Sequence, residues 1–185
     1  LWGNYNGTPV RTITILDGIK SKLRSSRIYY DKGCDLVEDK VIESYFSKCS
    51  IDGKAGFRAS YWNNLQRSGN PAAAQQINNP IKLTAAGQQG FAPGVVSEGF
   101  SAIYETEFIA PETEEIVFRC GATGFFEVLV NGESLTKYQY HRTVLARIPF
   151  NVERGKRYNI EIHYDQLYNW EANIEFDFGK EADIN

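Results

Sequence analysis

The sequence predicts a mainly β protein, an antiparallel β-sandwich preceded by a short α/β fragment. Aromatic residues make up 14% of its 185 residues, and aromatic side chains favour strands. Before residue 51 the hydrophobic residues recur at helical spacing. From about Ile51 onward they recur every second residue, the spacing that places alternate side chains on opposite faces of a sheet.

The first 50 residues are expected to contain a helix, a strand and a second helix. Hydrophobic residues at helical spacing over residues 14–23 predict the first helix. The segment Ile28-Tyr29-Tyr30 is typical of a short strand, and Asp35 with Glu38 resembles the capping box that begins a helix. The hydrophobic residues of this second helix are Val37, Val41, Ile42, Tyr45 and Phe46.

Seven segments alternate hydrophobic and polar residues and predict strands. They cover residues 55–62, 102–109, 115–120, 125–130, 143–150, 158–164 and 171–178. Asn131-Gly132 is the strongest hairpin dipeptide, and this many strands separated by turns indicates a β-sandwich or a small barrel. The stretch from Ser68 to Gly99 is rich in Gly, Pro, Gln and Asn, and we expect a long functional or mobile connection there.

Composition excludes several classes of function. Lys and Arg number 20 against 23 Asp and Glu, so the net charge of -3 provides no basic surface for nucleic acid. No apolar run reaches the ~20 residues that a membrane helix needs. The three cysteines, Cys34, Cys49 and Cys120, form no metal-ligand spacing and cannot all pair within one chain, so we expect no metal or other cofactor. The chain contains no methionine, which leads us to expect a fragment of a longer protein.

No motif predicts catalysis. His163 and Asp165 share one strand face and could bind a metal or polarise each other, or they could simply be solvated. Glu112, Glu114 and Glu115 follow a proline at a turn, where a solvated cluster and a pair of glycosidase carboxylates are both possible. We therefore assign no catalytic residue.

Aromatic residues at strand ends are candidates for carbohydrate binding, because sugar faces stack on exposed rings. The candidate rings lie in polar segments, and they are Tyr138, Tyr140, Tyr168 and Trp170. Gln166 and Asn169 lie beside them in the sequence and could bond sugar hydroxyls. The alternative is that these rings close the end of the core.

Three motifs near the start resemble glycoside hydrolase family 3. They are GNYNGTP at residues 3–9, TILDGIK at 14–20 and YDKGCD at 30–35, and they resemble the start of that family's α/β-sandwich domain in its β-glucosidase and β-xylosidase branches. From about Ile51 to Lys180 the chain resembles the protective-antigen-type module, a lectin-like β-sandwich inserted into that domain. The stretches that carry this second resemblance are residues 56–64, 100–104, 118–121, 128–132 and 154–158.

The resemblance implies a domain plan. Residues 1–50 would be a fragment of the α/β-sandwich domain, residues 51–180 the inserted β-sandwich, and residues 181–185 a tail or linker. The nucleophilic Asp and the acid/base Glu of the family belong to segments outside this chain. The parent would be a retaining β-glycosidase that releases glucose or xylose from the non-reducing end of β-glycosides.

The resemblance also implies partners and a location. The chain would contact an oligosaccharide or β-glycoside and the barrel and α/β domains of an exported parent, and it would shape the aglycone side of the active site. An independent carbohydrate-binding or adhesin module and a structural spacer or dimerisation element stay open as alternatives. We expect no binding of nucleic acid and no membrane insertion.

Two site expectations follow from the resemblance alone. The loop from Gly3 to Thr8 lies near the mouth of the active site in the family, which makes Tyr5 a candidate sugar contact. Many protective-antigen-type modules bind calcium through an Asp-Asp pair, and this chain has Thr123-Gly124 or Ala122-Thr123 at that place. Since a hard cation needs carboxylates, we expect no calcium-dependent sugar capture.

Overall fold

The computed structural model describes residues 15–23, 28–29, 40–85, 90–143, 145–168 and 171–183. The chain forms two compact units, residues 1–38 and 39–185, and each is described by itself. In the first unit, α1 (Ile15–Lys22) confirms the first predicted helix. Ile28 and Tyr29 lie in no strand, and the third residue of the strand predicted there is outside the described residues. No helix in the described part of the chain is long and apolar enough to span a bilayer.

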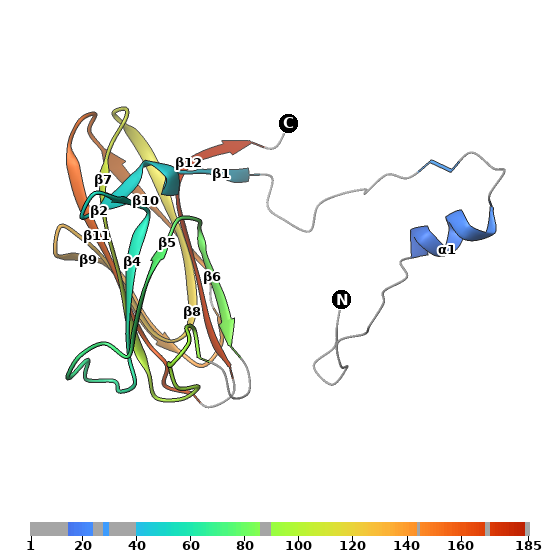
Figure 1. The fold of residues 1–185 in the computed structure, drawn as a ribbon. Coiled ribbons are helices and arrows are strands. Elements are labelled where there is room, and N and C mark those ends of the chain that lie inside the picture. The colour runs from blue at the N-terminus through green and yellow to red at the C-terminus, as the bar shows by residue number, and fades with distance from the viewer. Residues whose placement is uncertain are drawn as a thin grey trace. The chain divides into compact units, whose positions relative to one another are not determined.

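The second unit is a two-layer antiparallel β-sandwich, which confirms the predicted fold class (Figure 1). The first layer contains β1 (Lys40–Ser44), β6 (Ile81–Ala85), β10 (Ala146–Val152), β12 (Ala172–Asp183) and the first half of β8 (Glu114–Val130). The second layer contains β4 (Phe57–Trp62), β5 (Ala73–Ile77), β7 (Ser101–Ile109), β9 (Glu133–Tyr140), β11 (Arg157–Asp165) and the second half of β8. The short strands β2 (Cys49–Ile51) and β3 (Lys54–Ala55) extend the second layer beside β7, just after the 3₁₀ helix η1 (Phe46–Lys48).

Strand β8 belongs to both layers and joins them. Its residues 117–123 pair with β12, whereas its residues 125–130 pair with β11. Gly124 lies between these two stretches with a φ of 113°. A Cβ atom at this position would lie 2.2 Å from the carbonyl oxygen of Asp165, so only glycine allows the two backbones to approach this closely.

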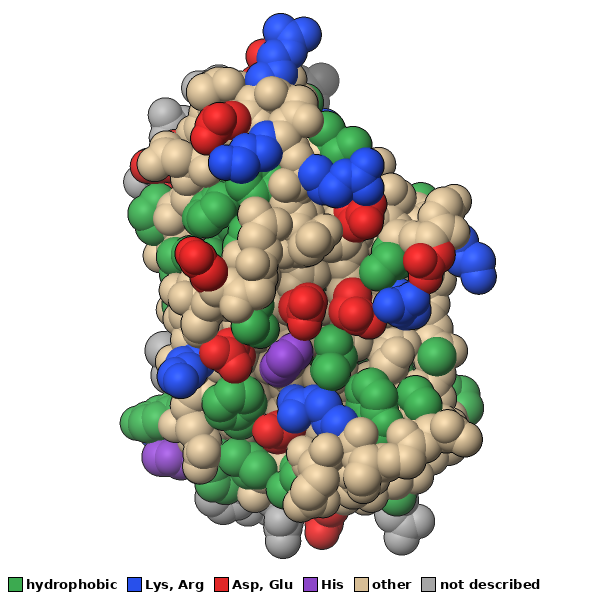
Figure 2. Space-filling view, turned by 90° about the vertical axis from the view of Figure 1, so that its left-hand side faces the viewer, with side chains coloured by type: hydrophobic (Ala, Val, Ile, Leu, Met, Phe, Trp, Pro, Cys, Tyr) green, Lys and Arg blue, Asp and Glu red, His purple; other side chains and the backbone are tan. Residues whose placement is uncertain are grey.

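The outer face of the second layer is polar and carries both signs of charge (Figure 2). Arg58 donates to Glu105 from the neighbouring strand, with a nitrogen–oxygen distance of 3.1 Å. Arg157 forms an ion pair with Glu107 in the same way. Exposed pairs of this kind contribute only ~0.2–1 kcal/mol each, so this face is solvated and the free energy of folding comes from the interior.

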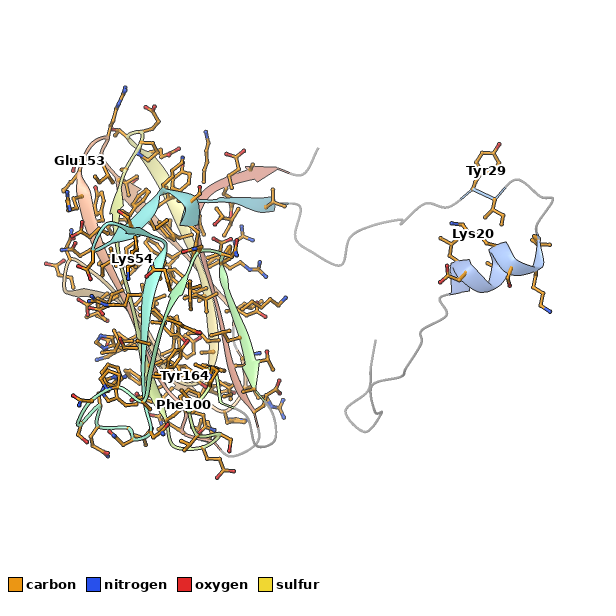
Figure 3. All side chains as sticks on the ribbon, viewed as in Figure 1. Lys20, Tyr29, Lys54, Phe100, Glu153 and Tyr164 are labelled. Carbon is orange, nitrogen blue, oxygen red and sulfur yellow. The ribbon has the colours of Figure 1, made fainter. Side chains whose placement is uncertain are left out.

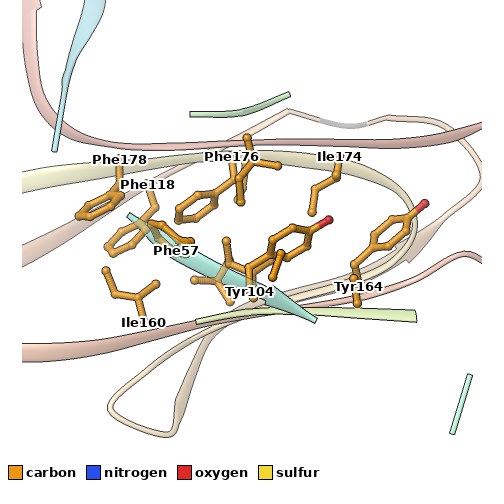
Figure 4. Packing of buried hydrophobic residues seen from close by; sticks show 14 of the residues in the cluster. Phe57, Tyr104, Phe118, Ile160, Tyr164, Ile174, Phe176 and Phe178 are labelled. Atoms are coloured by element: carbon orange, nitrogen blue, oxygen red, sulfur yellow. The ribbon is translucent and has the colours of Figure 1, made fainter. Parts of the chain in front are cut away.

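The interior is filled mainly by aromatic side chains from both layers (Figures 3 and 4). Phe118 and Phe178 stack with ring centres 5.3 Å apart and an interplanar angle of 9°. Phe57 from the second layer meets Phe176 from the first at 5.9 Å, edge to face. Contacts of this geometry contribute ~0.5–1.5 kcal/mol each beyond the burial of apolar area. In β4, β7, β11 and β12 alternate residues supply the core, as the alternation of their sequences indicates.

The helix predicted after Asp35 is wrong over its described part, because residues 40–44 form strand β1. Lys40 lies opposite Asp183 and Ser44 lies opposite Gly179 in an antiparallel ribbon with β12. Val41 and Ile42 are β-branched and suit a strand, so pairing with β12 overrides their helical spacing. The compact unit that contains the sandwich comprises residues 39–185, and residues 181–183 continue β12.

Three further strands lie where connections were expected. Strands β5 and β6 occupy part of the stretch between residues 68 and 99, because short strands rich in polar residues give little alternation signal. The hairpin prediction at Asn131-Gly132 is confirmed, with φ angles of 53° and 82°, and it leads into β9. The segments predicted as two strands at 115–120 and 125–130 are one continuous strand, β8.

We expect Gly124→Ala to destabilise the sandwich more than Gly132→Ala does. Both glycines have positive φ, which costs a residue with a Cβ ~1–2 kcal/mol. Nothing lies within 4 Å of a Cβ at Gly132, whereas at Gly124 the added atom meets backbone, which costs a further ~1–3 kcal/mol. Thermal unfolding of the two variants should therefore differ by roughly 2–12 °C. Equal melting midpoints would show that the layers do not depend on the close approach at Gly124.

Candidate functional site

The described candidate residues gather at one end of the sandwich, which we call the loop end. It consists of the segments 63–72, 91–100, 141–143 and 166–168, which follow or precede the strand ends near Gly124. In Figure 3 Phe100 and Tyr164 lie at this end and Glu153 lies at the opposite one. The two rings are 5.8 Å apart and form the base on which the loops rest.

Side-chain amides fix the loops of the loop end to one another. Asn63 donates to the carbonyl of Gly94 at 3.0 Å, and its Oδ1 accepts the N–H of Val96 at 2.9 Å. The hydroxyl of Ser101 donates to the carbonyl of Asn64 at 2.7 Å. Loops held in this way present their exposed side chains in a defined arrangement, as binding loops on a rigid scaffold do.

Tyr138 and Tyr140 lie on the same face of β9 but have different surroundings. Tyr138 is opposite Phe126 in β8, its ring centre is 5.4 Å from that buried ring, and burial raises the pKa of its phenol. Tyr140 is opposite Gly124, which has no side chain, and 45% of its surface is exposed. Tyr138 therefore belongs to the core, and Tyr140 presents its ring to solvent.

Tyr140, His141 and Tyr168 form a group that we call the aromatic cluster. The rings of Tyr140 and His141 are 4.6 Å apart, and Tyr168 contacts His141 edge to face at 6.4 Å. The segment that follows is held by a hydrogen bond of 3.1 Å between the hydroxyls of Thr143 and Thr123. Partly exposed rings in a fixed arrangement can stack on the face of a pyranose.

Gln166 is 2% exposed and lies two residues before Tyr168 of the aromatic cluster. Its Oε1 accepts the N–H of Gly99 at 2.7 Å, and its Nε2 donates to the carbonyl of Tyr168. Both ends of the amide are therefore used by backbone groups of two loops. Gln166 holds Tyr168 in place, and a direct bond from Gln166 to sugar stays a prediction.

An ion pair with little exposure holds the loop after β4 against the end of β11. Arg67 Nη2 lies 2.6 Å from Asp165 Oδ1, and the two side chains are 22% and 17% exposed. Burial raises the pKa of Asp165, and the guanidinium of Arg67 opposes that rise. This pair further orders the loop end.

In the other two candidate groups, His163 with Asp165 and the glutamates at residues 112–115, side chains bond to residues outside their own group. His163 lies 3.2 Å from Glu161, whereas Asp165 pairs with Arg67, so of the alternatives considered for these two residues a His163–Asp165 couple is not the closest pairing of either. Glu114 accepts the hydroxyl of Tyr45 at 2.5 Å. Within the described ranges, no group of three or more His, Cys, Asp or Glu side chains could hold a metal ion.

The described cysteines are buried and unreactive. Cys49 and Cys120 are free thiols, and burial raises the pKa of each to about 12. Since the thiolate is the nucleophile and the metal ligand, neither thiol can take either role at neutral pH. The third cysteine, Cys34, lies outside the described residues, as do the candidate residues Tyr5, Asn169 and Trp170.

A hollow of about 300 Å³ lies at the opposite end of the sandwich, between the β8–β9 turn and β10 and β11. Three of the residues that line it bond to one another. Lys156 pairs with Glu153 at 3.2 Å, and the N–H of Glu153 donates to the hydroxyl of Tyr158 at 2.9 Å. These three residues offer a ligand little, because their polar groups are already bonded, and the aromatic cluster is the stronger candidate.

Sequence reasoning did not include His141 in the sugar site. The signal was present, because His141 follows Tyr140 directly at the end of a hairpin strand. The fold makes His141 part of the cluster, because the chain turns after β9 and the imidazole packs against the ring of Tyr140.

We expect Tyr138→Ala to destabilise the protein more than Tyr140→Ala does, because only the Tyr138 ring packs in the core. Tyr138→Ala removes a ring packed against Phe126 and should cost about 2–4 kcal/mol of stability. Tyr140→Ala removes an exposed ring and should change stability by no more than ~0.5 kcal/mol. Urea unfolding of both variants measures the difference. A similar loss for Tyr140→Ala would place its ring in the core as well.

We also expect calcium to leave stability unchanged. Thr123 bonds Thr143, and Gly124 has no side chain, so the place of the expected acidic pair has no carboxylate to offer. A ligand bound only by the native state would add about 2.7 kcal/mol at a hundredfold excess over Kd. Melting midpoints in millimolar calcium and in chelator should therefore agree, and a rise of several degrees with calcium would contradict this assignment.

The structure is similar in fold to solved proteins of several kinds, among them a β-glucosidase and an adhesin domain. The β-glucosidase of Kluyveromyces marxianus in complex with glucose matches with a TM-score of 0.58 and 16% identity, over 99% of this chain and 23% of that one. The epithelial adhesin 9 A domain of Candida glabrata in complex with Galβ1-4GlcNAc matches with a TM-score of 0.52 and 11% identity, over 75% of this chain and 84% of that one. At these identities the likeness shows the fold alone.

Sequence comparison finds closer similarity. A xylan 1,4-β-xylosidase of Xylanibacter ruminicola is 38% identical over the whole of this chain, which spans only 22% of that relative. The PA14 domain family matches residues 53–180, which include every strand from β4 to β11 and most of β12. The chain therefore belongs to the PA14 domain family.

Proposed function

We propose that this chain is a non-catalytic segment of a glycoside hydrolase family 3 enzyme, in which the PA14 sandwich is an insert that binds part of the substrate. The parent would hydrolyse β-xylosides or β-glucosides, and the insert would contact the aglycone side. The observation that carries the proposal is the ribbon of β1 and β12. In this ribbon the first strand of the sandwich pairs with its last strand, so the chain enters and leaves the sandwich side by side.

The ribbon has the geometry that an inserted domain needs. Lys40 lies directly opposite Asp183, so a host chain could enter and leave the sandwich at one place. At its base the hydroxyl of Ser44 donates to Asp177 at 2.6 Å, and the N–H of Tyr45 donates to the carbonyl of Phe178 at 2.8 Å. These bonds fix the ribbon to the sandwich, so the insert would be attached at a defined angle.

The similarity to a xylosidase supports the same proposal. Identity of 38% extends across the whole chain, including the residues before the sandwich, and the chain corresponds to 22% of that relative. We propose that the residues before 39 belong to the α/β domain of the parent, with the boundary at the start of the ribbon. The nucleophile and the acid/base of a retaining enzyme would come from other segments of the parent.

A second candidate function is an independent carbohydrate-binding or adhesin module. The fold of an adhesin domain in complex with Galβ1-4GlcNAc favours it, because that protein covers 75% of this chain. The two candidates differ in the measurement that glycan binding would change. An insert changes turnover by its parent, whereas an independent module binds glycan with no catalytic neighbour.

We expect Tyr140→Ala with Tyr168→Ala in the full-length parent to raise the KM for xylo-oligosaccharides. If each ring contributes ~0.5–1.5 kcal/mol, the rise is roughly 5- to 150-fold for the pair. The kinetics on an aryl β-xyloside, which is too short to reach the cluster, should stay unchanged. A matched control is Ile109→Ala, an exposed hydrophobic residue opposite Arg157 and distant from the loop end.

Two outcomes would contradict the proposal. An unchanged KM for the long substrates would show that the aromatic cluster does not contact the substrate. An equal rise in the KM for the aryl xyloside would indicate a general structural effect. The 185-residue chain alone should not hydrolyse aryl β-xylosides or aryl β-glucosides. Glycan binding by this chain alone, together with unchanged kinetics of the altered parent, would favour the independent module.

A further inference from the structure

We infer that the aromatic cluster takes a glycan that carries a carboxylate, such as a uronic acid side group, and that Arg142 recognises this charge. The inference rests on the proposed function, because it requires the cluster to bind sugar. It adds the chemical class of the glycan and the residue that selects it.

Arg142 differs from the other described arginines. Five of them lie within 4 Å of a carboxylate, and these are Arg58, Arg67, Arg147, Arg154 and Arg157. Arg119 is close enough to Asp177 to oppose the rise in the pKa of that carboxyl. Arg142 is exposed and forms no ion pair with any residue in the described ranges. Its guanidinium is therefore available to an external anion.

The position of Arg142 follows from the bonds on both sides of it. Tyr140 precedes it by two residues, so their Cα atoms lie at most ~7.6 Å apart. Thr143, the next residue, is fixed to Thr123 by the hydroxyl bond of 3.1 Å. Arg142 is therefore held next to the aromatic cluster on an anchored turn, and its long side chain can reach the edge of a sugar stacked on Tyr140.

The chemistry of the guanidinium selects the carboxylate. Arginine presents parallel N–H donors that match the two oxygens of a carboxylate, and such charge-assisted bonds are stronger than bonds to neutral hydroxyls. The nearby Asp165 does not compete for Arg142, because it is neutralised by Arg67 at 2.6 Å. A neutral sugar would gain only the stacking, whereas a uronic acid would gain both interactions.

Calorimetric titration of the full chain with two matched glycans tests the inference. The probes are xylotetraose and xylotetraose substituted with one glucuronic acid. The unaltered chain should bind the acidic glycan roughly 1.5- to 5-fold more tightly, and raising the salt concentration should reduce this preference.

Variants identify the group responsible. Arg142→Ala should abolish the preference and leave the affinity for xylotetraose unchanged, whereas Arg142→Lys should keep part of it. The matched control is Glu171→Gln, which removes an exposed negative charge from the same end and should not lower the affinity for the acidic glycan. Unchanged melting midpoints show that each variant is folded.

The outcomes separate this inference from the proposed function. Equal affinities for the two glycans, tighter binding of xylotetraose, or a preference that survives Arg142→Ala would overturn the role of Arg142 and leave sugar binding by the cluster intact. Binding of neither glycan would overturn both the role of Arg142 and sugar binding by the cluster in this chain, whereas the proposed glycosidase insert is tested separately by the kinetics of the full-length parent.

Discussion

The close approach of two backbones at Gly124 is the constraint on which the rest of the sandwich depends. Strand β8 can pair with β12 on one side of this residue and with β11 on the other only because no Cβ stands between it and the carbonyl of Asp165. The same glycine leaves Tyr140 with no side chain opposite it. One residue therefore both joins the layers and exposes the ring that we propose as a sugar platform.

The fold was largely predictable because its core strands alternate strongly. In β12, Ile174, Phe176 and Phe178 point inward between polar residues, and the structure buries all three. Local sequence could not show that residues 40–44 form a strand, since their partner in β12 lies far along the chain. It also divided β8 in two, because glycine in a sequence suggests a turn and only the tertiary contacts show that Gly124 continues a strand.

The candidate site was predictable in its location more than in its members. Sequence placed several aromatic residues at strand ends, and a shared end of the sandwich is where antiparallel strands bring such residues together. Exposure could not be predicted, because it depends on the residue across the ladder. Tyr138 faces Phe126 and is drawn into the core, whereas Tyr140 faces Gly124 and stays outside. From the sequence Gln166 was expected at the surface, but it is buried and forms hydrogen bonds with the backbone of two loops.

The ribbon and the aromatic cluster lie at opposite ends of β12, and this separation bears on what an insert could do. From Asn173, which pairs beside Gly124, to Gly179, where the ribbon begins, the strand advances ~20 Å at ~3.3 Å per residue. If the ribbon joins the sandwich to its parent, the cluster stands about this far from the point of attachment. A single sugar unit in an active site beside the ribbon could not reach it. The cluster would therefore contact distant units of a long substrate, which is why the kinetics of long and short substrates should respond differently to its removal.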